Sequence, residues 1–122
     1  MAASANRRCD VTFTKNGNQS ISGSGATSFF SRIIMNMGYS ANNILDISAS
    51  SFSVRSTNFL TLTSGTFKLS SPNVTITPFT GATTLSTTCG IWLNNASAAI
   101  SFSNSITSSG SIRLSAGNMD VG

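Results

Sequence analysis

Short stretches in which apolar and polar residues alternate occur along most of the chain. Such alternation is typical of β-strands, because successive side chains of a strand point to opposite faces of the sheet. Turn-forming Gly, Ser, Asn and Pro residues separate the stretches. The pattern predicts strands at residues 11–14, 44–48, 52–54, 59–63, 66–70, 74–77, 90–94, 99–103 and 111–115. Residues 29–37 come nearest to helical spacing, but this stretch is too short and too rich in β-branched residues for a helix.

Apolar residues also recur at a longer interval of about 22 residues, and they fall into three columns. The first column is Ile47, Leu69, Ile91 and Ile112, the second is Ile33, Val54, Ile76, Ile100 and Val121, and the third is Leu62, Leu85 and Ile106. Adjacent strands are spaced so that three of them fill one interval. The sequence therefore predicts an all-β fold, a three-sheet parallel β-solenoid with about 22 residues per coil, whose core is built from these columns.

The same register predicts which side chains face solvent. In residues 66–70, Phe67 and Leu69 should face the core, while the polar residues between and beside them should face outward. Trp92 lies between Ile91 and Leu93 and should also face outward. The interval places Asp46 beside Lys68 on the next coil, which predicts an exposed ion pair worth at most about 1 kcal/mol.

The composition fits one domain with a polar but weakly charged surface. Of 122 residues, 24 are Ser and 15 are Thr, 39% are hydrophobic and 8% are charged. A disordered Ser/Thr-rich tract would lack so many apolar residues. We expect residues 1–10 to form a flexible or fragmentary N-terminal segment and residues 11–122 to form the solenoid. The net charge is +4, but the basic residues are scattered, so we expect no nucleic-acid partner. No apolar run is long enough to predict a membrane span.

The residues that usually carry catalysis are scarce. The chain has no His and no Glu, and its only acids are Asp10, Asp46 and Asp120. The predicted register separates Asp46 and Asp120 by more than three coils, which is too far for paired-carboxylate chemistry. Metal ligands show no usable spacing. We therefore expect no enzyme activity, no catalytic residue, no metal site and no cofactor.

Two cysteines and a few short motifs are the remaining candidates for chemistry in this sequence. Between three and four predicted coils separate Cys9 from Cys89, so the two are expected to lie too far apart for a disulfide. Cys89 should be a small buried corner residue, and Cys9 should be free or paired with another chain. Asn18, Asn73 and Asn95 match the glycosylation pattern, as a Ser/Thr-rich chain often does by chance. The Gly-rich stretch 23–28 fits no nucleotide-binding pattern.

Residues 16–38, read together with "NILDI", "NFLTLTSGTFKLS", "TITPF" and "GIWLNN", resemble a secreted repeat of large bacterial surface proteins. The resemblance covers roughly residues 11–115 and contains no catalytic signature. It implies a right-handed β-helix that acts as a stalk, adhesin or surface fibre, in an extracellular or cell-surface location. Many such proteins carry a C-terminal sorting domain. This chain shows no such domain and no signal peptide, so we expect an excerpt or a processed piece of a longer solenoid.

The expected function is therefore structural. The expected partners are other copies of the chain, stacked head to tail, or adjacent coils of a longer chain. The alternative is a carbohydrate-binding module, which would need Trp92 and a second aromatic residue such as Tyr39 on one exposed face. Surface glycans would then be the partner. A polysaccharide-degrading enzyme and an ice-binding protein, which would use the Thr-x-Thr units, are further alternatives.

Overall fold

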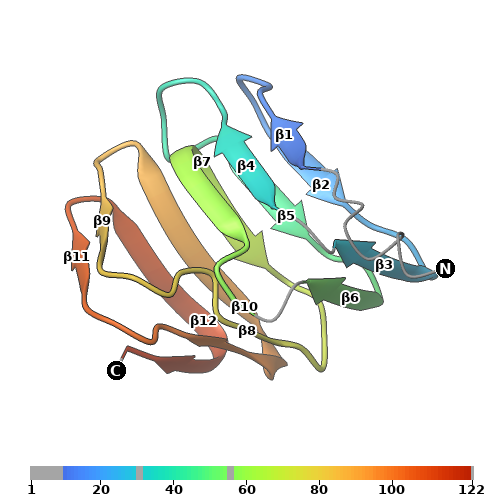
Figure 1. The fold of residues 1–122 in the computed structure, drawn as a ribbon. Helices are drawn as coiled ribbons and strands as arrows, with labels where there is room; N and C mark the ends of the chain where they lie inside the picture. Colours follow the sequence, from blue (N-terminus) through green and yellow to red (C-terminus); the bar gives the residue numbers. More distant parts are fainter. Residues whose placement is uncertain (1–9, 30–31, 55–56, 122) are drawn as a thin grey trace, which may run out of the picture.

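The computed structural model describes residues 10–29, 32–54 and 57–121, and within these ranges the chain forms strands, turns and bends without a helix. The coils follow one another in chain order along the stack, and each strand lies beside the matching strand of the next coil (Figure 1). They are β1 (Val11–Phe13), β2 (Gln19–Ile21), β3 (Ala26–Phe29), β4 (Ile33–Asn36), β5 (Ile44–Ile47), β6 (Ser51–Val54), β7 (Leu60–Leu69), β8 (Thr75–Ile76), β9 (Thr83–Leu85), β10 (Cys89–Ser101), β11 (Ile106–Ser108) and β12 (Ser111–Asp120). All pairings between them are parallel, as expected for a β-solenoid.

One sheet runs through all five coils and fixes the register of the stack. We call it the long sheet: it consists of β2, β5, the second half of β7, the first half of β10 and the first half of β12. One aligned row along it is Gln19, Leu45, Phe67, Ile91 and Ile112. The differences between successive residue numbers in this row are 26, 22, 24 and 21. A coil therefore averages about 23 residues, which confirms the predicted solenoid and places its repeat length close to the predicted one.

Two further sides close each coil. On one side, β1 pairs with β4 and β4 with the first half of β7, and β9 pairs with β11 in the later coils. On the other side, β3 pairs with β6, and β8, the end of β10 and the end of β12 form a three-stranded ladder. Two predicted strands, 59–63 and 66–70, are one continuous strand that turns the corner at Gly65, whose φ of 100° favours glycine. The predicted strands 90–94 and 99–103 likewise belong to one strand, because β10 also spans a corner.

The core is a single apolar cluster inside the stack. Its largest members are fully enclosed: Phe59, Phe67, Ile33, Met35, Met37, Leu45, Ile47, Leu69, Ile76, Leu85, Ile91 and Leu93. The rings of Phe59 and Phe67 pack at 5.9 Å in a tilted arrangement, which aromatic pairs favour. Ile100 is buried too, while Val54, Leu62 and Ile106 are partly buried against the cluster. Cys89 is a buried corner residue, as predicted, and its thiol is free. Cys9 lies outside the described residues.

The predicted columns select many core residues but misalign them. Ile91 pairs with Phe67, and Leu93 is the residue that pairs with Leu69. The predicted first column therefore shifts by two positions at Ile91, which keeps the side chain on the same face. The second column joins different sides of the coil, because Ile33 pairs with Leu60. Ile76 and Ile100 do pair, and Met119 continues that row in place of Val121.

In the third column, Ile106 pairs with Thr83, so it lies two positions away from Leu85 along that side. The last coil also departs from the predicted core. Ile112 is 39% exposed and Val121 is 56% exposed. Both were expected inside the stack, and both are exposed because no described coil follows to cover them. Strands that the sequence pattern did not predict lie at β2, β3, β4, β9 and β11.

Candidate functional site

The outward side of the long sheet carries a row of chemically distinct side chains, which we call the outer column. Because Leu45, Phe67 and Ile91 point inward, the residues after them point outward. The strand register aligns these outward residues as Ser20, Asp46, Lys68, Trp92 and Arg113. Three of the chain's few charged residues are thus brought onto one line that runs along the stack.

Asp46 and Lys68 form the predicted ion pair. The Lys68 Nζ lies 3.9 Å from Asp46 Oδ2, and the side chains of Lys68 and Asp46 are 19% and 32% exposed, respectively. Ser70, on the same coil as Lys68, donates a hydrogen bond of 2.7 Å to Asp46 Oδ1. The carboxylate is therefore held on both oxygens from the next coil. At this exposure and distance, the ion pair contributes at most about 1 kcal/mol.

Trp92 lies outward, as predicted, and its ring contacts a cation from each neighbouring coil. Lys68 Nζ is 4.0 Å from the ring centroid and Arg113 Cζ is 4.1 Å from it. Its indole N–H donates a 2.9 Å hydrogen bond to Ser115 Oγ. Each cation–π contact is worth about 0.5–1 kcal/mol at an exposed site. Since both neighbouring coils supply a cation, the indole fixes the positions of two positive charges and offers less open ring surface for stacking.

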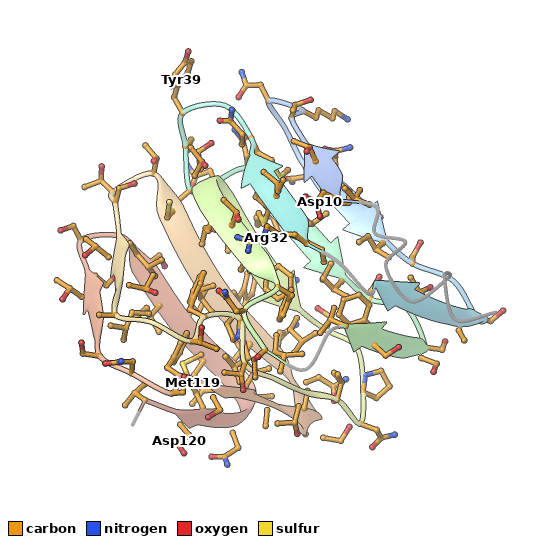
Figure 2. All side chains as sticks on the ribbon, in the orientation of Figure 1. Asp10, Arg32, Tyr39, Met119 and Asp120 are labelled. Atoms are coloured by element: carbon orange, nitrogen blue, oxygen red, sulfur yellow. The ribbon has the colours of Figure 1, made fainter. Side chains whose placement is uncertain are left out.

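The second coil has a longer corner than the fourth coil, and this corner lies beside the outer column. Residues 37–43 connect β4 to β5, whereas only residues 86–88 connect β9 to β10 in the fourth coil. The Asn43 side chain holds this corner by donating to Met37 O at 2.6 Å and to Asn16 Oδ1 at 2.8 Å. Thr66 ties it to the sheet, because its hydroxyl donates to Ala41 O at 2.5 Å. Tyr39 stands at the tip, 93% exposed, and points away from the body (Figure 2).

Two shallow hollows flank the outer column. The first, of about 330 Å³, is lined by Asn18, Gln19, Ser20, Ile44, Asp46 and Lys68. The second, of about 170 Å³, is lined by Ala41, Asn42, Ile44, Thr66, Trp92, Ser111 and Arg113. Tyr39, a candidate contact residue, lines neither hollow, although its own corner walls the second one. Trp92, the other candidate, does line a hollow.

The edge of the last coil is a second notable surface. β12 ends the long sheet, and no other strand in the described part of the chain pairs with its outer edge. Ile112 and Leu114 align with the buried Ile91 and Leu93 of the preceding coil, yet Leu114 is 54% exposed. The solenoid therefore presents core-type side chains and strand backbone at this end.

Groups that could support catalysis or metal binding are not gathered in the described ranges. No group of three or more Asp, Cys, Glu or His side chains within residues 10–29, 32–54 and 57–121 is arranged to hold a metal ion. Asp10 lies near the first strand, where its Oδ1 accepts from the backbone N–H of Arg32, and Asp120 lies in the last coil (Figure 2). In the same ranges no helix is long and apolar enough to cross a membrane.

The sequence pattern located part of the outer column and missed the rest. The repeat length was enough to place Lys68 next to Asp46. The pairing of Lys68 with Trp92 and of Trp92 with Arg113 could be found only from the observed register, because neither pair is separated by the predicted 22 residues. The signal that was available is the combination of an outward Trp with basic residues roughly one coil away on either side.

The chain matches no protein-family model, no curated protein and no solved structure. The structure therefore shows the fold of the chain, which is a parallel β-solenoid of about five coils.

Proposed function

We propose that this chain is a structural solenoid unit that grows by stacking a second copy, head to tail, onto the edge of β12. The observation that supports the proposal is this edge, which exposes Ile112 and Leu114 in positions where the preceding coil buries its equivalent residues. A long strand edge with exposed apolar side chains is a template for pairing with another chain. A head-to-tail contact does not close on itself and gives a filament.

The N-terminal coil offers the matching surface. In a second copy stacked in register, β2 would follow β12, so Gln19 would cover Ile112 and Ile21 would cover Leu114. Ile21 is only partly buried in the single chain, so it can gain cover from such a contact. The parallel direction is that of all pairings inside the stack.

The contact should be weak for a single junction. Fully burying an aliphatic side chain contributes about 1.5–3 kcal/mol, and Ile112, Leu114 and Val121 are each about half exposed, so each adds about 1 kcal/mol. New strand hydrogen bonds add about 0.5–1.5 kcal/mol each. Association costs at least about 4 kcal/mol. Assembly should therefore depend strongly on protein concentration.

The resemblance to repeats of bacterial surface proteins supports a location outside the cell, as part of a stalk, adhesin or fibre. A non-enzymatic role fits the scarcity of acids and the absence of His in the sequence. The mechanism we propose is mechanical: stacked coils give stiffness, and the hydroxyl-rich sides give contact surfaces.

Sedimentation velocity across a concentration series, with electron microscopy of the highest concentration, tests the proposal. The wild-type chain should form filaments, and Leu114→Lys should remain a folded monomer because a charge then faces the next coil. Thr107→Lys is the matched control, since it adds the same charge to an exposed residue of the last coil that points sideways. A wild-type chain that stays monomeric throughout, or that stops at a dimer, would refute head-to-tail growth.

A further inference from the structure

The smaller hollow, of about 170 Å³, has the construction of a binding site. The longer corner 37–43 forms one wall, and Trp92 with Arg113 forms the other. This corner is longer than the corresponding corners 14–18 of the first coil and 86–88 of the fourth. In repeat proteins, insertions into repeats map to loops on one face, often the binding face. The Thr66 hydroxyl holds this corner against the next coil through Ala41 O, and the Asn43 amide holds its two ends together through Met37 O.

Gly90 leaves open space at the bottom of this hollow because it has no side chain. Gly90 precedes Trp92 by two positions on β10 and therefore faces the same outward side. A methyl group at Gly90 would clash with the Thr66 hydroxyl of the preceding coil. The hollow thus exists between Thr66 and Ser111 because the coil between them has no side chain at this position.

The charge of the hollow is positive. Arg113 is the one charged residue among those that line it in the described part of the chain, and the acid of the outer column, Asp46, lines the other hollow. The Arg113 guanidinium lies over the indole, which fixes its position. A guanidinium has five N–H donors in a rigid fork that fits a carboxylate, and stacking on an aromatic ring leaves its edge open to a partner.

We propose that this hollow binds a carboxylate-bearing sugar residue of an acidic polysaccharide. The carboxylate accepts hydrogen bonds from the Arg113 guanidinium, and the sugar hydroxyls contact the Asn42 amide and the Ser111 hydroxyl. The chain of sugars runs along the stack. Two coils away, or about 10 Å at the usual strand spacing, it passes Lys68, whose charge is shared with Asp46.

Other anionic polymers fit this surface less well. The backbone groups of β7 and β10 are paired along the ladder, and the unpaired groups of β12 lie at the edge of the sheet and not on its outward face, so an acidic peptide in the hollow finds no main-chain partner. Single-stranded nucleic acid stacks its bases on open aromatic faces, and cations cover the Trp92 ring. A sugar acid is recognised by the guanidinium, amide and hydroxyl groups that the hollow does present.

Isothermal titration calorimetry with an oligomannuronate tests the site. The matching oligomannose, which lacks only the carboxylates, is the ligand control. We expect the wild-type chain to bind the acid and not the neutral oligomer. Arg113→Gln should weaken binding about tenfold or more, because a charge-assisted fork is lost. Arg113→Lys should recover part of the loss, since it restores the charge without the fork.

Lys15→Gln is the protein control, because it removes one exposed positive charge from the first coil, away from the hollow. It should change affinity by less than about twofold. Equal losses in Lys15→Gln and Arg113→Gln would overturn the proposal in favour of a diffuse charge effect. Equal binding of oligomannose, no binding of oligomannuronate, or tighter binding of polyglutamate or oligothymidylate would also overturn it. Thermal unfolding of each variant shows that it is folded.

This inference does not depend on stacking. The same titration with Leu114→Lys measures the hollow on a chain whose end is blocked. Binding that persists there while filaments are lost would separate the two proposals, and either one can fail alone.

Discussion

The contact between Gly90 and Thr66 gives a direct test of the coil register. The two residues are paired on adjacent coils, and both face the outward side of the long sheet. A Cβ at position 90 would overlap the Thr66 hydroxyl and would lie 3.3 Å from both its Cβ and its Cγ2. Of the two other Thr66 rotamers, one places the methyl group where the hydroxyl lies, and both move the hydroxyl away from Ala41 O. The Thr66 hydroxyl is also bonded to Ala41 O, which holds it in place.

The expected free energies follow from these contacts. Gly90→Ala should cost about 1–3 kcal/mol from overpacking. About 0.5–1 kcal/mol of this is offset because alanine loses less backbone entropy than glycine. Thr66→Ala should cost about 1–2 kcal/mol, from one hydrogen bond and one buried methyl group. In the double variant the overlap with the hydroxyl is gone and a 3.3 Å contact between the two Cβ atoms remains, so adding Gly90→Ala to Thr66→Ala should be close to neutral.

Urea denaturation of the four chains measures this double-mutant cycle, with the slope m checked for two-state behaviour. The double variant should be more stable than the sum of the single effects predicts by about 1–2 kcal/mol. Gly81→Ala is the matched control, because a Cβ there meets nothing within 4 Å, so its effect should not depend on Thr66. If the effects of Gly90→Ala and Thr66→Ala add within about 0.5 kcal/mol, the two residues are not in contact and the register is wrong.

Four further outcomes follow from the packing. Phe67→Ala should lower the free energy of unfolding by about 3–5 kcal/mol, because the ring is fully enclosed; a loss below about 1 kcal/mol in urea denaturation would contradict the core. Asp46→Asn should cost about 1 kcal/mol or less and the cost should shrink in high salt; an effect independent of salt would speak against the ion pair. Asn73 has a φ of 56°, so Asn73→Gly should be nearly neutral while Asn73→Ala costs about 1 kcal/mol, and equal thermal stability of the two variants would argue against that turn. In a Cys9→Ser chain, the buried Cys89 thiol should resist a thiol reagent until urea unfolds the protein; rapid labelling of the native chain would show that the corner opens.

The fold could be predicted because the long sheet repeats one simple rule. Inward residues such as Leu45, Phe67 and Ile91 are apolar, and the residue after each is polar or amphipathic. A period of two identifies each such strand, and a period near 22 shows that the strands stack. These signals depend on local sequence and on the average coil length, and both are visible without knowledge of any corner.

The register could not be predicted because it depends on the corners. The steps along the long sheet are unequal, and the largest of them, from Gln19 to Leu45, spans the corner 37–43. A shift by two positions preserves the inward and outward alternation, so the pattern alone does not distinguish Ile91 from Leu93 as the partner of Leu69. What separates them is the close fit of neighbouring coils around Gly90, which requires the coordinates of both coils.

The same limit explains why the candidate site was found only in part. Trp92 could be identified as outward from its two apolar neighbours, and Lys68 from its distance to Asp46. The hollow itself also needs Arg113, which is aligned by the last step, and the corner that carries Asn42. Tyr39 was a reasonable partner for Trp92 by residue type, yet it projects from the tip of that corner (Figure 2). No property of the sequence around Tyr39 indicates this direction.

The alternation of β12 separates the two proposed roles on a single strand. Ile112 and Leu114 lie in the inward rows and would contact the next coil, while Arg113 between them lies in the outer column. Adjacent side chains of a strand point to opposite faces, so a change at one position leaves the other surface almost intact. Leu114→Lys should therefore abolish filaments and keep oligomannuronate affinity. Arg113→Gln should keep filaments and weaken oligomannuronate binding. If each substitution removed both properties in chains whose thermal unfolding matches that of the wild type, filament growth and sugar binding would share one surface, and the assignment of one role to each face of β12 would be wrong.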